Sequence, residues 1–370
     1  MSKAAELAAL IGSGQAQGDR NLIINGAMKV AQRGTSSTGL GASSGYFTVD
    51  RFRMNFNTSG RLTMTQEAIT DLEGFANAIK LVCTTADTSI ASGENLFIQH
   101  RLEGQDLQQL EKGTSGAKPI TLSFYVKGNA AATYTAEIRD QDNTRFNGQE
   151  FSVTTSWNRV SLTYVGDTTG AYDDDNENSL TLGFILHAGS AYTGGTFASN
   201  TWQTTTDKRV GDNQTSFFDS TDRTFFITGL QMEIGETATP FEHEDFGTTL
   251  AKCQRYYTIE KAGTGGVYKR LALGQCQDST SAGFILSLST PLRGTPTLET
   301  SGNSNHYQTY SAGAVDTLTG ILLTSDSDAG TYNHNIAFNV TVSSGLVAGD
   351  GTELVTNNNA SYYLAFDAEL

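Results

Sequence analysis

Positive charge is scarce in this 370-residue sequence. Its 24 lysine and arginine residues are outnumbered by 39 aspartate and glutamate residues, which gives a formal net charge of −15 at pH 7. The phosphates of a nucleic acid and the head groups of an anionic membrane would repel such a chain. The charge balance therefore predicts no nucleic-acid partner and no association with anionic membranes.

Cysteine is also rare. The three residues Cys83, Cys253 and Cys276 are odd in number and form no Cys-x-x-Cys pair, so their spacing indicates neither a disulfide framework nor a zinc site. We interpret them as buried, reduced thiols of a chain that folds in a reducing cytosol. The histidines show no His-x-His or His-Glu-x-x-His spacing. We predict no cofactor, no metal centre and no catalytic residues.

Long hydrophobic runs are missing as well. No apolar run approaches the ~20 residues that a membrane span needs, and the alanine-rich start MSKAAELAALIG is interrupted by Glu6. We expect no export signal and no membrane insertion. Residues 1–20 are predicted to form a short helix for attachment or oligomerisation, with Leu7, Leu10 and Ile11 as its contact residues. The alternative is a frayed terminus.

Short stretches of alternating apolar and polar residues fill most of the remaining sequence, together with 39 glycines. This pattern is typical of half-buried strands separated by loops. Ile120–Lys127 alternates in this way, and so do 159–164 and 180–187. The segment 103–111 is more helical. We predict an all-β protein with two β-sandwich, jelly-roll-like domains in tandem after the short N-terminal helix: residues 21–246, an elbow at 247–257, and residues 258–370.

The stretch 225–257 is predicted to close the first domain and lead into the second. Phe226, Thr228, Leu230, Met232 and Ile234 would share one face of a strand, with Gln231 and Glu233 on the other. A short helical turn is expected from Thr248.

Two features near the N-terminus predict local structure. Leu22, Ile23 and Ile24 are contiguous, as in a strand covered on both faces, and Asn25-Gly26 is a tight-turn signal. Asp50 and Arg51 would face opposite sides of a strand and therefore need separate buried partners, which indicates a structural network.

Several motifs together resemble the tail-fibre and other virion-surface proteins of tailed bacteriophages. The first is NLIINGAMKVAQRGTS followed by a Gly/Ser-rich loop and YFTVDRF, in which Phe52 stands where the similar family usually has Trp. The later motifs occur in the same order over roughly residues 1 to 300: ITLSFYVKG, SWNRVSLTYVGD, GLQMEIGETATPFEH, CQRYY and TPLRGTPTLE. The last has Leu292 where Met is usual.

This resemblance implies a non-enzymatic virion protein, a tail fibre or similar exposed fibre, assembled in the cytoplasm of the bacterial host. It would be a homotrimer that joins other virion proteins through its N-terminus and binds a host-surface glycan or outer-membrane protein. A head decoration or vertex fibre is an alternative within the same class. A carbohydrate-binding module or a glycan depolymerase is the alternative from another class.

Aromatic side chains in polar loops are the candidate glycan- or receptor-binding residues, because sugars stack on aromatic rings. They are Tyr192, Trp202, Tyr307 and Tyr310. In the alternative interpretation, these rings pin long loops onto the sandwich or fill a subunit interface.

Acidic residues offer two further candidates. The loop containing Asp173, Asp175 and Glu177 has oxygen ligands suited to calcium, although a solvated loop explains it as well. The pairs Asp140/Asp142, Glu242/Glu244 and Asp326/Asp328 lie in hydrophilic segments. Both acids of each pair should be ionised there, whereas a glycosidase needs one protonated carboxylic acid.

Overall fold

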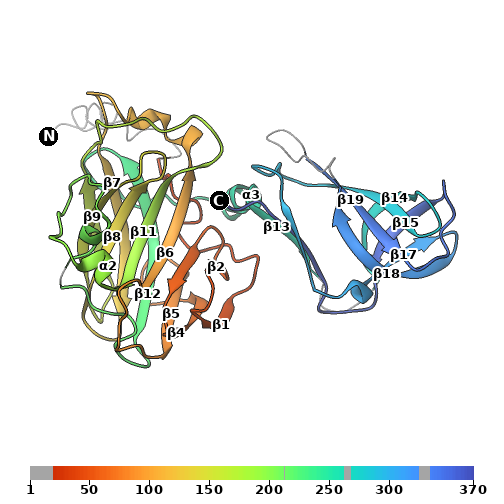
Figure 1. The fold of residues 1–370 in the computed structure, drawn as a ribbon, viewed down its shortest axis with the longest axis horizontal. Helices are drawn as coiled ribbons and strands as arrows, with labels where there is room; N and C mark the ends of the chain where they lie inside the picture. The colour runs from red at the N-terminus through yellow and green to blue at the C-terminus, as the bar shows by residue number, and fades with distance from the viewer. Residues whose placement is uncertain (1–19, 212, 262–267, 325–333) are drawn as a thin grey trace. The chain divides into compact units, whose positions relative to one another are not determined.

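A computed structural model describes residues 20–211, 213–261, 268–324 and 334–370. The predicted N-terminal helix, with Leu7, Leu10 and Ile11, lies outside these residues, as do Asp326 and Asp328. The chain divides into two compact units, the first comprising Met1–Thr249 with Leu370 and the second Leu250–Glu369 (Figure 1). The described residues include no helix long and apolar enough to cross a membrane.

The first unit consists of two six-stranded antiparallel sheets, as expected for a β-sandwich. One sheet has the order β1 (Ser36–Leu40), β4 (Arg61–Ala68), β5 (Asn77–Thr85), β12 (Thr224–Ile234), β7 (Ile120–Gly128) and β10 (Asn158–Tyr164). The other has the order β2 (Gly45–Tyr46), β3 (Arg53–Asn57), β6 (Asn95–Glu103), β11 (Asn178–Ala188), β8 (Ala132–Asp140) and β9 (Arg145–Val153). The helical elements of this unit are η1 (Gly104–Asp106), η2 (Gln108–Leu110), α2 (Ser190–Thr193) and η3 (Thr206–Lys208).

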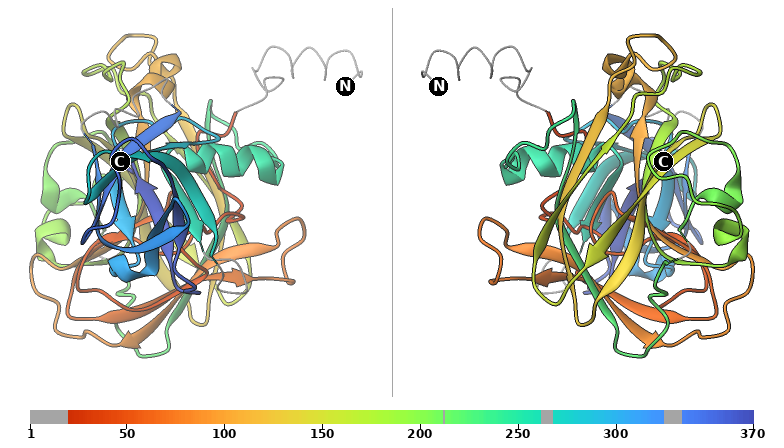
Figure 2. Two further views of the ribbon diagram at one scale, coloured as in Figure 1. Left: turned by 90° about the vertical axis from the view of Figure 1, so that its right-hand side faces the viewer. Right: turned by 90° about the vertical axis from the view of Figure 1, so that its left-hand side faces the viewer.

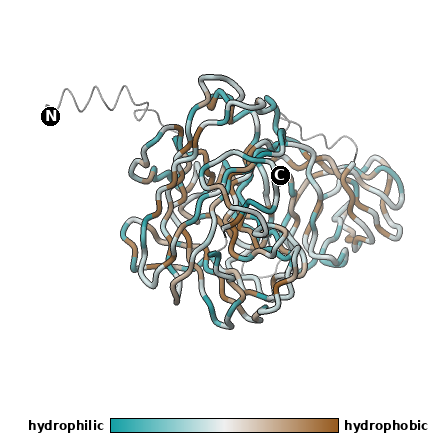
Figure 3. The backbone as a smooth tube through the Cα atoms, turned by 60° about the vertical axis from the view of Figure 1, so that its left-hand side comes forward, coloured by the Kyte–Doolittle hydropathy of each residue, from teal (hydrophilic) through white to brown (hydrophobic). Residues whose placement is uncertain are grey.

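The alternation predicted for β7 fits its burial between the two sheets. β11 was also predicted to be half-buried, but it is buried on both faces, because Ile185 on its other face packs against Phe97 and Val210. The apolar residues predicted to face inward on β7 and β11 are all buried. Phe124 packs edge-on against Phe151 and Phe184, with ring centroids 5.1 and 5.0 Å apart. Each fully buried side chain of this size contributes about 1.5–3 kcal/mol to folding. Hydrophobic segments along the backbone are correspondingly short (Figure 3).

All three cysteines are buried and none forms a disulfide, as predicted. Burial raises the pKa of the Cys83 thiol.

The side chains of β12 that point into the core differ from the predicted ones, because the strand contains a β-bulge. Its pairing with β7 shifts register between Thr228 and Gln231, and Gly229 there has a φ of +62°. A Cβ at Gly229 would lie 2.8 Å from the Phe75 ring, so a glycine is required at this position. The bulge brings Phe225 and Ile227, rather than Phe226, into the core with Leu230 and Met232.

The predicted helical turn after this strand is α3 (Phe246–Gln254). Asp245 caps it, because its Oδ1 accepts a hydrogen bond from the Thr248 backbone N–H at 3.0 Å. Hydrogen bonds from Thr248 also lower the pKa of the Asp245 carboxyl.

The second unit differs from the predicted sandwich because its sheet closes on itself. Six strands form a closed barrel in the order β14 (Arg270–Cys276), β15 (Ser281–Ser287), β19 (Asn335–Val342), β18 (Ala314–Leu323), β17 (Tyr307–Ser311) and β20 (Gly351–Thr356). Closure pairs β20 with β14 and removes the exposed edges that an open sheet would leave. A second sheet contains β13 (Tyr257–Lys261), β21 (Tyr363–Asp367) and β16 (Thr297–Thr300), and η4 spans Ser304–His306. In Figure 2 the strands of the second unit are coloured from teal to blue.

The segment after Arg20 forms turns and not the predicted strand. Its backbone pairs with β12 at two points, where the Leu22 N–H donates to the Met232 carbonyl (2.9 Å) and the Leu230 N–H to the Gly26 carbonyl (3.0 Å). The predicted turn at Asn25-Gly26 is confirmed. A Cβ at Gly26 would lie 2.1 Å from the Leu230 carbonyl oxygen, so only glycine allows this close approach.

Asp50 and Arg51 are fully buried, as the network prediction requires, but they lie in a turn between β2 and β3. Arg51 has a φ of +72°, which is not an extended conformation. Both carboxylate oxygens of Asp50 accept hydrogen bonds from Gln32, at 2.8 and 2.6 Å. The Arg51 guanidinium donates to the Arg101 carbonyl at 2.7 Å. The turn therefore joins the N-terminal segment to the sheet that contains β6.

His100 belongs to the same network. Its ring packs edge-on against Phe52, with centroids 5.3 Å apart, and its Nε2 lies 3.1 Å from both the backbone N and the carbonyl O of Ile24. Burial, assisted by the Arg51 guanidinium, holds the pKa of His100 well below its ordinary value of 6.5.

Replacing Arg51 by Ala should lower the free energy of unfolding of the first unit by about 3 kcal/mol, because it removes a buried, hydrogen-bonded charge. Arg51→Gly removes the same side chain but accommodates the positive φ, so it should be about 1 kcal/mol more stable than Arg51→Ala. Trp157 and Trp202 are the only tryptophans and both belong to the first unit. Their fluorescence during urea unfolding reports this unit. A loss of about 0.5 kcal/mol, typical of surface substitutions, would contradict the prediction.

Acid should destabilise the first unit through His100. The unfolded chain binds a proton on this residue below pH 6.5, whereas the folded chain does not. Stability is therefore fully present above pH 6.5 and falls as the pH decreases below it, by up to about 1.4 kcal/mol per pH unit for one proton. Urea unfolding followed by tryptophan fluorescence measures the free energy of unfolding at each pH. Between pH 6 and 5, this free energy should fall less steeply with decreasing pH in His100→Gln than in the wild type. An unchanged slope would show that His100 titrates alike in both states.

Candidate functional site

An open groove on the outside of the barrel combines exposed tyrosines with polar groups. Its volume is about 350 Å³. We call it the tyrosine groove, and seven residues line it: Tyr268, Arg270, Gln308, Tyr310, Val315, Glu353 and Val355. The two rings remain accessible, with Tyr268 58% and Tyr310 43% exposed, whereas Gln308 and Val355 are buried.

Strand register brings these residues together. Tyr310 on β17 pairs with Glu353 on β20 and with Val315 on β18. Val355, two residues along β20, pairs with Gln308 on β17 and Arg270 on β14. Residues two apart on a strand share one face, so the groove lies across four neighbouring strands. The intervening Leu354 and Thr309 are buried inside.

The groove offers apolar surface and edge groups for hydrogen bonds. Arg270 Nε donates to Glu353 Oε2 at 2.6 Å, and this ion pair is partly exposed to solvent. A guanidinium, a carboxylate and the Gln308 amide supply both donors and acceptors. Tyrosine rings provide flat apolar faces with a hydroxyl at one end. This arrangement suits a ligand that has both an apolar face and hydroxyl groups.

Another large hollow lacks these features. It lies on the first unit, measures about 510 Å³ and is lined by Ala117, Pro119, Thr163, Val165, Gly166, Asn200 and Glu236. No aromatic ring is among these residues. The tyrosine groove is therefore the stronger candidate for a binding site.

Among the four aromatic residues singled out in the sequence, Tyr310 lies in the groove and Tyr307 does not. Tyr307 is completely buried, and its ring packs edge-on against Tyr362, with centroids 6.1 Å apart. Because the two tyrosines are three residues apart on one strand, they face opposite sides. The interpretation of Tyr307 as a contact residue for a ligand does not fit this position.

Tyr192 contributes to packing in the first unit. Its hydroxyl accepts a hydrogen bond from Asn95 Nδ2 at 3.1 Å, its ring packs edge-on against Phe97, and the Arg209 guanidinium lies 5.4 Å from the ring centroid. Arg209 is buried and forms an ion pair with Glu137. These contacts favour the alternative in which Tyr192 pins a long loop onto the sheet.

Trp202 is also half-buried. Its Nε1 donates to the Val165 carbonyl at 2.7 Å, and its ring packs against the main core. The hollow that it lines with Lys112 and Tyr172 measures only about 10 Å³, room for about one water molecule. A sugar ring does not fit there.

The acidic candidates occupy two different environments. Asp173, Asp175 and Glu177 are exposed. Within the described residues, their carboxylates do not lie close enough together to hold a metal ion. Asp140 is fully buried rather than in a solvated loop, and its Oδ2 lies 2.7 Å from Lys112 Nζ. The ion pair accounts for its burial.

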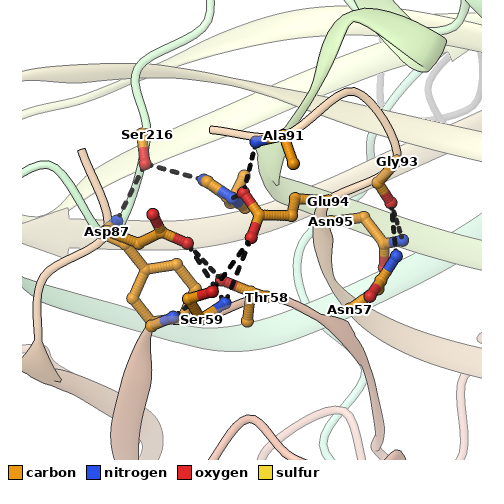
Figure 4. Close-up of polar contacts among 12 residues, drawn as sticks. Asn57, Thr58, Ser59, Asp87, Ala91, Gly93, Glu94, Asn95 and Ser216 are labelled. Atoms are coloured by element: carbon orange, nitrogen blue, oxygen red, sulfur yellow. Dashed lines mark hydrogen bonds and ion pairs between the residues drawn. The ribbon is translucent and has the colours of Figure 1, made fainter. Parts of the chain in front are cut away.

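A second cluster of titratable groups was missed in the sequence. One side-chain ligand atom from each of Asp87, Glu94 and His187 lies within 4.8 Å of the others, and all three residues are buried. Glu94 follows Asp87 by seven positions, and β11 supplies His187 from far along the chain. No local spacing signals such a site. We call it the carboxylate–histidine cluster; Figure 4 shows the surroundings of its two carboxylates.

Comparison with known sequences gives no match to a family or to a curated protein. Comparison with solved structures finds distant similarity to a phage tailspike domain and to carbohydrate-binding modules. The enzymatically active domain of tailspike protein 4 of bacteriophage CBA120 is 14% identical with a TM-score of 0.31, and the match covers 58% of this chain but only 21% of that one.

Two carbohydrate-binding modules are similar over their whole length. The family 30 module of a Clostridium thermocellum cellulosomal cellulase is 13% identical, with a TM-score of 0.30, and the match covers 60% of this chain and 100% of the module. A family 61 module in complex with β-1,4-galactotriose is 8% identical, with a TM-score of 0.30 and coverages of 58% and 99%. At this level of similarity, none of these proteins indicates what the present chain binds.

Proposed function

We propose that this chain is a surface protein of a tailed-phage virion, a tail fibre or similar exposed fibre, whose second unit binds a glycan of the host cell. The observation that carries the glycan-binding proposal is the tyrosine groove, in which exposed Tyr268 and Tyr310 lie beside Arg270, Gln308 and Glu353. Sugar rings stack their apolar faces on aromatic side chains, while amide and charged groups read their hydroxyls.

The groove binds its ligand without cleaving it. Among the described residues that line it, Glu353 is the one carboxylate, and Arg270 is hydrogen-bonded to it. Glycoside hydrolysis in most families uses two carboxyl groups, one of which has a raised pKa. These features support a non-enzymatic function over a depolymerase.

The placement on a virion rests on the phage-like motifs, which run from Asn21 to Glu299. A head decoration or vertex fibre fits the same motifs, and an outer-membrane protein is the alternative receptor. Residues 1–20 would attach the chain to other virion proteins, which assemble in the host cytoplasm.

A homotrimer is part of this proposal. Its support is an exposed apolar pair on the barrel, where Leu273 and Ile285 are cross-strand neighbours with 70% and 62% of their surface accessible. Neighbouring exposed apolar side chains favour a contact with another protein surface. Three linked grooves would also strengthen a weak single-site affinity through avidity.

The glycan proposal predicts that Tyr310→Ala weakens binding to host-surface polysaccharide about tenfold or more per site, since it removes one of two stacking rings. Tyr310→Phe keeps the ring and should retain most of the affinity. Calorimetry or a binding assay on immobilised polysaccharide measures the difference. Leu322→Ala is the matched control, because Leu322 is 71% exposed on the same barrel but does not line the groove.

Equal affinity for wild type, Tyr310→Ala and Leu322→Ala would exclude the groove as the site. Loss of binding in Leu322→Ala alone would point to another face of the barrel.

Exchanging residues 258–370 for the matching domain of a fibre from a phage with another host should transfer host range. Recognition by polar loops and tyrosines on a rigid scaffold depends on that domain's own surface. Plaque formation on both hosts measures the outcome. Host range that stays with the N-terminal part would contradict the assignment of the receptor site to the second unit.

A further inference from the structure

The carboxylate–histidine cluster holds two buried carboxylates without a lysine or arginine partner. Asp87 and Glu94 are 7% and 8% exposed, and within the described parts of the chain neither forms an ion pair with a lysine or an arginine. Two unpaired carboxylates side by side are unfavourable in a protein interior, where buried charges are normally paired or bound to a metal.

The hydrogen bonds to these carboxylates come from neutral groups. The Ala91 N–H donates to Glu94 Oε2 at 2.7 Å. The Ser59 backbone N–H is shared between Asp87 Oδ2 and Glu94 Oε1, at 3.2 and 3.3 Å, and the Thr58 hydroxyl donates to Asp87 Oδ2 at 3.2 Å (Figure 4). The Ser59 hydroxyl also donates to Glu94 Oε1 at 3.4 Å. These neutral donors orient the carboxylates without supplying a positive charge.

His187 contributes a polar atom with no partner. The residue is completely buried, and its Nε2 has no hydrogen-bond partner among the described residues. The nearest carboxylate oxygen, Glu94 Oε2, is 3.8 Å away, which is too far for a hydrogen bond. Nε2 is therefore buried, unsatisfied and close to two carboxylates.

The orientation of the ring is fixed from its other side. Nδ1 lies 2.8 Å from Ser216 Oγ, and the Phe218 ring packs edge-on against the imidazole with centroids 5.3 Å apart. The Ser216 hydroxyl also accepts the Phe218 N–H at 3.1 Å. A partner that holds Nδ1 leaves Nε2 as the ligand atom, which is how metal-binding histidines are usually supported.

The surrounding backbone holds the ligands in place. The Asp87 N–H donates to the Phe218 carbonyl at 2.8 Å, and the Gly189 N–H donates to the Glu94 carbonyl at 2.8 Å. A Cβ at Gly189 would lie 2.0 Å from the Ala91 carbonyl oxygen. The loop between β5 and β6 is therefore packed closely against the end of β11, before any ligand binds.

We propose that Asp87, Glu94 and His187 form a binding site for a divalent first-row transition-metal ion. Two carboxylates and one imidazole are the donor set of Zn²⁺ and Mn²⁺, whereas Ca²⁺ and Mg²⁺ take oxygen ligands. The ion would neutralise the two carboxylates and tie the β5–β6 loop to β11. This site is separate from the tyrosine groove and stabilises the first unit.

The test uses the full-length chain stripped with EDTA and then dialysed against Zn²⁺, Mn²⁺, Ca²⁺ or Mg²⁺. We expect elemental analysis to find about one equivalent of Zn²⁺ or Mn²⁺ after dialysis. The thermal midpoint of the first unit, followed by tryptophan fluorescence, should rise by about 5–10 °C when the metal is about 100-fold above its Kd. Ca²⁺ and Mg²⁺ should give no comparable rise.

Two variants and one control make the result specific. Glu94→Gln and His187→Gln should lose the bound equivalent and the rise in midpoint. Stripped Glu94→Gln should be at least as stable as the stripped wild type, because one of two buried like charges is gone. Glu73→Gln removes an exposed carboxylate from the connection between β4 and β5 and should behave like the wild type.

The proposal is overturned if neither Zn²⁺ nor Mn²⁺ binds stoichiometrically, or if only Ca²⁺ raises the midpoint. A rise that persists unchanged in both Glu94→Gln and His187→Gln overturns it as well.

Discussion

The outer surface of the barrel depends on the alternation of side chains along its strands. Tyr307 and Tyr310 are three residues apart on β17, so the first ring fills the barrel and the second lies outside it. Register with β20 carries the same alternation to Glu353 and Val355, whose neighbours Leu354 and Thr352 are buried. The requirement to bury one face of each strand thus places polar and aromatic side chains together on the other face, where a ligand can reach them.

Much of the first unit could be predicted from the sequence, because each strand there has one apolar face. The residues of β7 alternate without interruption, and the structure buries the predicted side chains. In β11 the apolar Ile185 interrupts the alternation, and this strand is buried on both faces. The prediction was wrong where local geometry changes the period. The bulge at Gly229 shifts Phe225 and Ile227 into the core, and a glycine in a strand pattern signals only that a bulge is allowed. Closure of the second sheet depends on the pairing of β14 with β20, which no local pattern reveals.

The candidate sites were harder to predict because they depend on contacts between distant segments. Tyr310 was identified from its polar, loop-like surroundings, but its groove partners Arg270 and Glu353 come from strands 83 residues apart. Side chains alternate along a strand, so Tyr307 and Tyr310, which are three residues apart, must face opposite sides of it. The carboxylate–histidine cluster gave no signal, since ordinary loop acids and a strand histidine meet only after folding. Burial without a lysine or arginine partner distinguishes Asp87 and Glu94 from Asp140, which pairs with Lys112.

The central claim is that a glycan binds to the tyrosine groove of the second unit. Hydroxyl-radical footprinting of the full-length chain, with and without purified host-surface polysaccharide, tests it most directly because it reports each aromatic side chain separately. The account predicts that the polysaccharide protects Tyr268 and Tyr310, while the oxidation of Tyr192 and Trp202 in the first unit stays the same. Protection confined to Tyr192 or Trp202, or equal oxidation of Tyr310 in both samples, would contradict it.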